Sequence, residues 1–386
     1  MMTLSYEMTP NSFGKYPMAM ISSDVIPNRN LKPTMTGSVE LGFELRFLKN
    51  RIGLDFTYYN QHSKDQILRM NTSYASSYNY QLINAGDIEN KGVEIVLNTR
   101  PIELKDFSWD LNLNFAKNSN KVKELANGID EFELASARWL GVKVVAKVGE
   151  NYGCIMGKDF LRNENGDIII DGTSGLPKMT DDLKVLGNAS WDWTGGITTN
   201  LRYKNFSLGA IFDVKVGADL YSMSARSAYA TGKHKDTLEG RDAWYQSEEK
   251  RLEAGVTPAA WKATGGYVAK GVIQQDDGTY KPNDIYVDPQ VYWAYVSTQT
   301  ARPFIYDNSY VKLRELTLSY VFPRKLLGKS LNALTLSFVA RNLFNIYKNV
   351  PNIDPDSNYN NGAGMGLEFG SLPSRRSFGL NVNLKF

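Results

Sequence analysis

The sequence has a single cysteine, Cys154, among its 386 residues. One cysteine excludes an intrachain disulfide framework and any cysteine-based metal site. There is no run of about 18 apolar residues, so a transmembrane helix is excluded. The opening segment, MMTLSYEMTPNSF, lacks a basic stretch followed by an apolar one, unlike a signal peptide. A β-barrel membrane protein passes these filters, because its strands alternate apolar and polar residues.

The net charge is also low, and residue types that are typical of catalytic sites are few. A formal net charge of +3 gives no electrostatic reason to expect a nucleic-acid partner. The two histidines, His62 and His234, are far apart in sequence, and with Cys154 they offer no nucleophile–base spacing and no zinc-ligand pattern. The sequence therefore predicts neither an enzyme nor a cofactor or metal site.

What the sequence does contain is strict alternation of apolar and polar residues. The segment FSWDLNLNF (107–115), for example, places its aromatic and leucine residues at every second position. Such a period of two indicates β-strands and not helices. The last strand ends on an aromatic residue, with apolar residues at Phe378, Leu380, Val382, Leu384 and Phe386. Nine segments follow this scheme: 38–47, 52–59, 92–99, 107–115, 191–203, 206–216, 316–322, 334–340 and the C-terminal segment.

The links between these segments alternate between short and long. Short links are expected at 48–51, 101–106, 204–205 and 323–332, and long ones at 61–80, 117–187, 217–304 and 345–373. This alternation is typical of outer-membrane barrels, which have short periplasmic turns and long outer loops. The parity places the chain terminus on the periplasmic side, where Phe386 suits the interfacial aromatic girdle.

Local signals refine this expectation. The alternation slips between Leu313 and Leu316, which predicts a β-bulge near Arg314-Glu315. Asn165-Gly166 and Asp277-Gly278 predict hairpins with type I′ turns inside long links. Residues 143–160 are expected to form β structure within an outer loop, and residues 236–255 are the one segment with a plausible helical pattern.

Several long stretches resemble the C-terminal part of SusC/RagA-family TonB-dependent outer-membrane transporters. One of them is DNSYVKLRELTLSYVFP (307–323), and the resemblance extends over almost the whole chain. The other stretches are 26–60, 83–102, 183–208, 339–360 and 366–386.

This resemblance implies an all-β transmembrane antiparallel β-barrel in the bacterial outer membrane, of which this chain supplies about the last nine of 22 strands. Residues 1–33 are expected to form an extracellular loop before the first strand, and residues 34–386 to form the barrel part. The plug domain and the early strands are expected to lie outside this chain. Nine strands alone would leave lipid-exposed edges, which membranes do not tolerate.

The resemblance also implies a function and partners. The expected function is active import of oligosaccharides or peptides with a SusD-like surface lipoprotein. TonB would act through the missing N-terminal part. Outer-membrane lipid and the barrel-assembly machinery are further expected partners, and the assembly machinery would recognise the terminal strand from Phe378 to Phe386. A passive porin, an adhesin barrel or a soluble lectin-like sandwich stays the alternative.

Aromatic residues are dense in the longest link, 217–304, where rings could stack on sugars or pack against peptide side chains. They could equally form the core of the link or a contact with the lipoprotein. The candidate substrate-binding residues are Tyr221, Trp244, Tyr245, Trp261, Tyr267, Tyr292, Trp293 and Tyr295.

The segment IDPDSNYNNG (353–362) spaces Asp354, Asp356, Asn358 and Asn360 like a calcium loop. Tyr359 stands where an EF-hand needs glycine, and Met365 where it needs a bidentate glutamate. The sequence therefore favours an Asx-rich loop, with calcium binding as the alternative.

Overall fold

The computed structural model describes residues 6–21, 25–26, 28–76, 78–126, 128–137, 141–328, 330–358 and 362–386. Within them the chain divides into two compact units, described separately below. One consists of Met1–Pro101, Leu111–Phe132 and Ala146–Tyr152, and the other of Ile102–Asp110, Glu133–Val145 and Gly153–Phe386. None of the helices in these described ranges is both long and apolar enough to cross a membrane.

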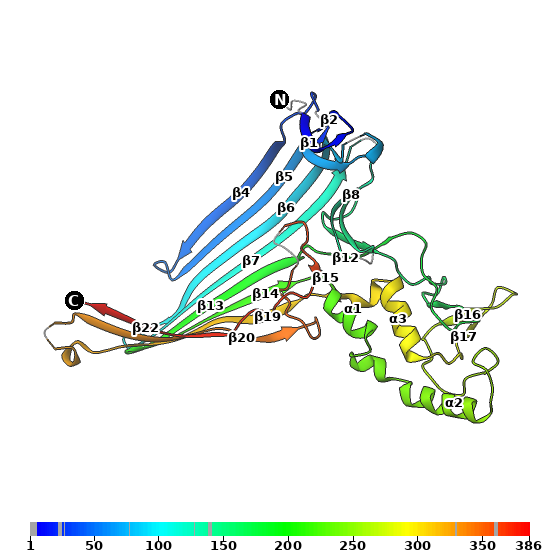
Figure 1. Cartoon of the computed structure of the whole chain (residues 1–386). Helices are drawn as coiled ribbons and strands as arrows, with labels where there is room; N and C mark the ends of the chain where they lie inside the picture. Colours follow the sequence, from blue (N-terminus) through cyan, green and yellow to red (C-terminus); the bar gives the residue numbers. More distant parts are fainter. Residues whose placement is uncertain are drawn as a thin grey trace. The chain divides into compact units, whose positions relative to one another are not determined.

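All nine predicted strands are present, which confirms the all-β expectation (Figure 1). They are β4 (Met35–Phe47), β5 (Ile52–Asn71), β6 (Tyr80–Glu103), β7 (Phe107–Glu124), β13 (Trp193–Tyr203), β14 (Phe206–Val216), β19 (Tyr310–Val321), β20 (Ala333–Lys348) and β22 (Ser377–Lys385).

The first unit contains the antiparallel strand order β4-β5-β6-β7, in which β7 contributes its residues from Leu111 onward. Pairing between β5 and β6 continues as far as Asn71↔Tyr80, so the predicted long link 61–80 is wrong for most of its length. Only residues 72–79 connect these strands, and they include the short helix η1 (Tyr74–Ser76). Gly92 lies opposite Tyr59, whose ring occupies the space that a Cβ at residue 92 would need.

The segment before β4 contains a hairpin of β1 (Tyr6–Phe13) and β2 (Tyr16–Ile21), and β3 (Val25–Ile26) pairs with β6. The expected extracellular loop 1–33 therefore includes regular β structure, while its residues 1–5, 22–24 and 27 lie outside the described residues.

In the second unit the strand order is β13-β14-β19-β20-β22, and the register separates two faces. One row of apolar residues crosses the five strands directly opposite one another: Leu201, Leu208, Leu318, Phe338 and Leu380. The next row is polar: Arg202, Ser207, Ser319, Ser337 and Asn381.

The apolar face of this sheet is exposed. The exposed fraction is 40% for Leu208, 49% for Leu318, 45% for Phe338 and 68% for Leu380. A contiguous exposed apolar face is unfavourable in water and is what a lipid-facing barrel wall requires. The polar face carries the hydrogen bond between the Ser319 and Ser337 hydroxyls, 2.8 Å apart.

The predicted bulge is confirmed. The register of β19 shifts between Leu313 and Glu315 against β20, and the β14 pairing shifts between Ile211 and Phe212. The extra residue is Arg314, and the shift returns Leu313 to the apolar face. Residue 314 can therefore reach a polar cluster described below.

The terminal strand β22 is exposed along its whole length, and among the described strands it pairs with β20 alone. Its last pair, Ala333↔Lys385, lies beside the short link before β20, so Phe386 is at the short-link end of the sheet. The apolar residues of this strand have large exposed fractions: Phe378 65%, Leu380 68%, Val382 53%, Leu384 45% and Phe386 78%.

At the other end of these strands the long links fold together into what we call the outer subdomain (Figure 1). Three predicted loops contribute to one core, in which Ile155, Leu186, Tyr221, Phe304 and Leu367 are buried. The subdomain strands are β8 (Glu131–Ser136), β9 (Lys143–Lys147), β10 (Cys154–Gly157), β11 (Ile169–Ile170), β12 (Lys184–Asn188), β15 (Asp219–Ser222), β16 (Val272–Gln274), β17 (Tyr280–Pro282), β18 (Ile305–Asp307) and β21 (Leu367–Glu368).

The helical content of the outer subdomain exceeds the prediction. The predicted helix at 236–255 is confirmed as α2 (Arg241–Glu253), preceded by the short helix η2 (Lys235–Leu238). Two helices were not predicted, α1 (Met223–Ala230) and α3 (Pro289–Gln299). A further short helix, η3 (Arg302–Phe304), belongs to this subdomain, whereas η4 (Arg324–Leu326) lies in the short link between β19 and β20.

Both glycine turns are present, with a corrected type. β16 and β17 form the hairpin at Asp277-Gly278, and Arg162 bridges Ile168 around Asn165-Gly166. Only the glycine of each pair has a positive φ, 86° at Gly166 and 83° at Gly278. A type I′ turn needs positive φ at both central residues, so that part of the prediction is wrong.

Candidate substrate pocket

The eight candidate aromatics lie in four parts of the outer subdomain. Tyr221 is in β15, Trp244 and Tyr245 are in α2, and Tyr292, Trp293 and Tyr295 are in α3. Trp261 and Tyr267 lie in the segment between α2 and β16. The structure gives these residues different roles.

Two candidates are buried packing residues. Tyr221 has no exposed surface and lies in the core formed by the three long links. Its burial raises the pKa of its hydroxyl above the usual range. Tyr292 is 8% exposed, and its ring centroid lies 4.5 Å from that of Tyr267. As folded here, neither Tyr221 nor Tyr292 offers a ring face to a ligand.

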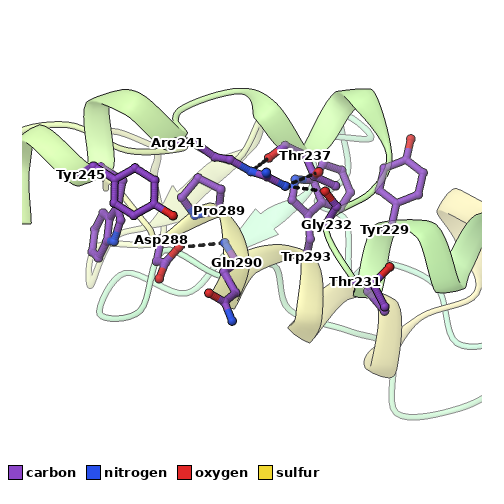
Figure 2. A pocket seen from close by; sticks show the side chains of 12 residues that line it. Tyr229, Thr231, Gly232, Thr237, Arg241, Tyr245, Asp288, Pro289, Gln290 and Trp293 are labelled. Carbon is purple, nitrogen blue, oxygen red and sulfur yellow. Dashed lines mark hydrogen bonds between the residues drawn. The ribbon is translucent and has the colours of Figure 1, made fainter.

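A cavity of about 330 Å³ lies between α2, α3 and the residues that end α1 (Figure 2). Its volume is within the range of small-molecule sites. Three of the eight candidates line it, Trp244, Tyr245 and Trp293. We call it the α2–α3 pocket; its other lining residues are Tyr229, Ala230, Thr231, Gly232, Thr237, Arg241, Asp288, Pro289 and Gln290.

Arg241 stabilises the wall of this pocket through hydrogen bonds to Thr237 and Gly232. Its Nε donates to the Thr237 carbonyl at 2.7 Å, and one terminal nitrogen donates to the Gly232 carbonyl at 2.7 Å and to the Thr237 hydroxyl at 2.7 Å (Figure 2). These bonds tie the start of α2 to the turn after α1. Among the described residues no carboxylate forms an ion pair with Arg241. Much of the hydrogen-bonding capacity of Arg241 is thus spent on the fold.

Asp288 performs a similar structural task at the start of α3. Its side chain accepts a hydrogen bond from the backbone N–H of Gln290 at 2.8 Å, and Pro289 occupies the first turn. This is a standard N-cap with proline at a favoured position. The cap orients the first turn of α3, so that the Gln290 side chain lines the pocket.

Trp293 joins the pocket to the aromatic cluster behind it. Its ring lies 4.7 Å from Tyr229 and 5.0 Å from Tyr292 between centroids. Its Nε1 is buried and has no hydrogen-bond partner among the described residues. Trp261 differs, because its Nε1 donates to the Ser247 hydroxyl at 3.1 Å. An unpaired buried donor costs free energy, so such a donor calls for an explanation.

Tyr229 is held in its neutral form. Burial raises the pKa of its hydroxyl well above the usual range, and its hydrogen bond to Asp236 at 2.6 Å acts in the same direction. The ring also stacks on His234, with centroids 4.1 Å apart. Tyr229 is therefore a neutral part of the pocket wall at all physiological pH values.

A second, larger cavity of about 1010 Å³ is lined by Trp244 and Trp261, and we call it the Trp261 pocket. Ile273, Ile285 and Tyr286 supply apolar surface to it. Trp244 lines both cavities. Tyr267 and Tyr295 line neither of the two and pack against the core around Val296.

Sequence reasoning pointed to the link that contains this cavity but did not single out three of its lining residues, Arg241, Asp288 and Gln290. The dipeptide Asp288-Pro289 is a recognisable helix start and could have revealed α3. Nothing local to Arg241 indicated its role, since its three bonds reach back across the α1–α2 turn.

The segment with calcium-like spacing bonds to cations of the protein. Asp354 and Asp356, here called the acidic pair, accept hydrogen bonds from Lys312 at 3.1 and 2.7 Å. Arg314, the bulge residue, also donates to Asp356 at 2.9 Å and to Asp213 at 3.0 Å. These bonds hold residues 354–356 against Lys312 and Arg314 of β19. No group of metal-binding residues occurs in the described part of the chain, and Tyr359 and Asn360 lie outside it.

The electrostatics of the acidic pair follow from these contacts. Burial alone would raise the pKa of Asp356, but the hydrogen bonds from Arg314, Lys312 and Tyr310 outweigh burial and lower it. Burial also opposes ionisation of Asp354, yet hydrogen bonds from Ser374 and other donors lower its pKa. Both carboxylates are therefore ionised at neutral pH and anchor the segment.

Comparison with known proteins adds an independent observation. A family model described as "TonB dependent receptor-like, beta-barrel" matches residues 5–209. TonB-dependent receptor P3 of Formosa agariphila is 26% identical over 386 aligned residues, which cover 93% of this chain and 35% of the relative. TonB-dependent receptor SusC of Bacteroides thetaiotaomicron is 28% identical over 211 residues, 51% of this chain and 21% of SusC.

Among solved structures, the RagAB peptide transporter is similar in fold. It matches 100% of this chain and 38% of its own chain with a TM-score of 0.71 at 17% identity. The chain thus spans roughly a third of the length of the relatives, 35% in the case of P3.

Proposed function

This chain belongs to the TonB-dependent receptor β-barrel family, and we propose that it is the C-terminal part of an outer-membrane active importer of oligosaccharides or peptides. The resemblance to SusC/RagA proteins is confirmed. The chain is part of an outer-membrane barrel, and its family is one of transporters and not of enzymes.

The observation that carries the proposal is the α2–α3 pocket on the outer subdomain. It is a concave site lined by Trp244, Tyr245 and Trp293, at the end of the sheet opposite Phe386. With Phe386 on the periplasmic side, this pocket faces the cell exterior. Such a position suits the first capture of a nutrient.

We further propose the roles of the partners. A SusD-like lipoprotein would cover the outer subdomain, and TonB would act through the part of the protein outside this chain. The RagAB protein, which is similar in fold, is named a peptide transporter. The terminal residues Phe378, Leu380, Val382, Leu384 and Phe386 would be read by the barrel-assembly machinery.

The proposed contact residues are Trp244, Tyr245, Trp261 and Trp293, because each lines a cavity. Tyr221, Tyr267, Tyr292 and Tyr295 support the fold of the site instead.

The test uses the full-length protein in its native host. A panel of glycans and peptides is first screened for the complex nutrient whose use requires the gene. Deleting the gene should abolish growth on that nutrient and leave growth on simple sugars and free amino acids intact. Restoring the gene in a strain without TonB should not restore growth, because active import needs that energy source. Growth that returns without TonB would refute active import and favour the passive porin.

A further inference from the structure

We propose that the short-link end of the sheet β13-β14-β19-β20-β22 is a docking surface for the phosphate headgroups of anionic phospholipids. Short turns of outer-membrane barrels are periplasmic, so these lipids belong to the inner leaflet of the outer membrane. The surface is at the opposite end of the sheet from the outer subdomain and takes no part in the proposed capture of a nutrient. Three features carry the proposal: the charge of the turns, a cavity between two of them, and the aromatic residues beside them.

The turns at this end of the unit are rich in exposed cations. The described ones come from three short links and the adjoining strand ends: Lys105, Arg202, Lys204, Arg324, Lys325 and Lys385. None of these six forms an ion pair within the part of the chain that the structure describes. Glu103 and Asp106 are the acidic side chains described at the same end. The surface therefore carries a net positive charge, and basic clusters beside a membrane attract anionic lipids.

A cavity of about 490 Å³, here called the turn cavity, lies between two neighbouring turns. Lys105, Arg202 and Lys204 line it, together with the acidic residue Asp106. The two turns are joined, because the Lys204 N–H donates to the Asp106 carbonyl at 2.7 Å. The volume is within the range of small-ligand sites. Three cations against one carboxylate make the cavity suitable for a phosphate group, which accepts charge-assisted hydrogen bonds from such donors.

The conformation of Lys204 supports a function for its ammonium group. Its φ is 49°, in the left-handed region where glycine and asparagine are favoured. A lysine in this conformation has a backbone cost, and such costs are concentrated at functional sites. The next residue fixes the turn, since the Asn205 side chain donates to the Val321 carbonyl at 2.6 Å and the Val321 N–H donates to the Asn205 carbonyl at 2.9 Å. Lys204 is thus held at a defined place in the row of turns.

A row of aromatic rings places these cations at the depth of the headgroups. Tyr203, Phe206 and Tyr320 lie opposite one another on the exposed apolar face of the sheet. The ring centroids of Phe206 and Tyr320 are 4.6 Å apart, and Tyr203 is 55% exposed. Such rings lie at the boundary between lipid and water in outer-membrane barrels. Lys204 directly follows Tyr203, so its long side chain can reach the layer of lipid phosphates.

The apolar neighbours of the cations favour a lipid over an acidic protein. Leu104 and Leu326 are each 67% exposed. Leu104 precedes Lys105 in its turn, and Leu326 follows Lys325. Exposed leucines are unfavourable in water, whereas beside headgroups they can insert between acyl chains. Cations interleaved with exposed leucines therefore match a partner that combines a phosphate with acyl chains.

The test measures lipid binding to the full-length protein in detergent by native mass spectrometry. The probes are phosphatidylglycerol, phosphatidylethanolamine and inorganic phosphate. The protein should bind phosphatidylglycerol more tightly than phosphatidylethanolamine, and this preference should weaken as the salt concentration rises. Inorganic phosphate should not displace the bound lipid. Equal binding of the two lipids would overturn the proposal and favour an acidic protein as the partner of these cations. Displacement of the lipid by inorganic phosphate would overturn it in favour of a free-anion site.

Variants then locate the docking surface. Lys105→Gln combined with Lys204→Gln should weaken phosphatidylglycerol binding about thirtyfold, at roughly fivefold for each lysine. Lys105→Arg combined with Lys204→Arg keeps both charges and should bind like the parent protein. Lys204→Gly alone keeps the turn, because glycine readily adopts a positive φ, and should weaken binding about fivefold. The matched control is Lys233→Gln combined with Lys250→Gln, which removes the same charge from exposed positions of the outer subdomain and should change nothing.

Heat-modifiable gel mobility reports whether each variant barrel is folded. Parent-like phosphatidylglycerol binding by the folded Lys105→Gln, Lys204→Gln variant would refute the docking surface, and so would an equal loss in the control pair. TonB-dependent growth on the nutrient measures the import function separately, so the failure of one proposal is distinguishable from the failure of the other.

Discussion

Glu368 is the residue whose removal should most disturb the outer subdomain. Its carboxylate has no exposed surface and accepts five hydrogen bonds. The donors are the Ser222 hydroxyl at 2.8 Å, the backbone N–H and hydroxyl of Ser224 at 3.0 and 2.7 Å, and the backbone N–H groups of Gly370 and Ser371 at 2.6 and 3.1 Å. The carboxylate thus joins the start of α1 to the last long link.

The expected cost follows from what the substitution leaves unpaired. Each buried donor without its acceptor costs about 1–3 kcal/mol, although such costs do not add fully. For Glu368→Ala we expect the free energy of local opening to fall by about 3–5 kcal/mol, as when a buried charge network loses one partner. Glu368→Gln keeps the size and one acceptor oxygen, so about 1–2 kcal/mol should be lost.

Amide hydrogen exchange of the full-length protein in nanodiscs measures this local free energy. In Glu368→Ala, exchange at Ser224 and Ala225 should accelerate about a hundredfold or more, since about 1.4 kcal/mol corresponds to a factor of ten. Exchange in β13 and β14 should not change. Glu249→Ala, an exposed glutamate on α2, is the control. Equal exchange at Ser224 in the two alanine variants would show that Glu368 does not hold the subdomain together.

Three further predictions concern the barrel wall and the segment above it. Leu111→Arg should cost roughly 2–4 kcal/mol near the membrane midplane and reduce assembly, whereas Asn112→Arg should be tolerated; equal heat-modifiable mobility would refute the assigned faces. Removing Phe386 should lower the amount of full-length protein in the outer membrane, as measured by immunoblot. An unchanged amount would show that the terminal ring has no role in assembly. The acidic pair has lowered pKa values, so its contribution is present above the unfolded value of about 3.9 and is lost as the pH falls below it. Protease cleavage next to the acidic pair should therefore begin only below about pH 4, and Lys312→Met should permit it at neutral pH; identical cleavage profiles would contradict the anchoring.

The sequence predicted the strands well where lipid imposes a pattern. Alternation identified all nine strands, and its slip located the bulge at Arg314. It failed where the strands continue beyond the apolar pattern. β5 and β6 have 20 and 24 residues, while a membrane crossing needs only about 9–11. Outside the lipid, cross-strand hydrogen bonds maintain the strands without any alternation, so composition alone gave no signal there.

The sequence predicted aromatic density in the link that forms the cavities, but not which rings line them. Aromatic density pointed to residues 217–304, yet it could not distinguish Tyr221, which is fully buried, from Tyr245, which is 64% exposed. That difference depends on packing against residues from other links. α3 was missed because its sequence, PQVYWAYVSTQ, is rich in residues that favour strands. Tertiary contacts of Tyr292 and Val296 with the core outweigh this preference.

The parallel pairing of β15 with β21 has a consequence for the order of folding. The Ser222–Glu368 bond joins residues that are 146 positions apart, and Tyr221 pairs with Leu367 beside it. Closing so long a loop has an entropic cost, which arises before any native contact can offset it. The hairpins of the wall involve near neighbours in sequence and can form early. The outer subdomain can complete its core only after the link between β20 and β22 has packed into it. Substrate binding should therefore be the last function that the folding protein acquires.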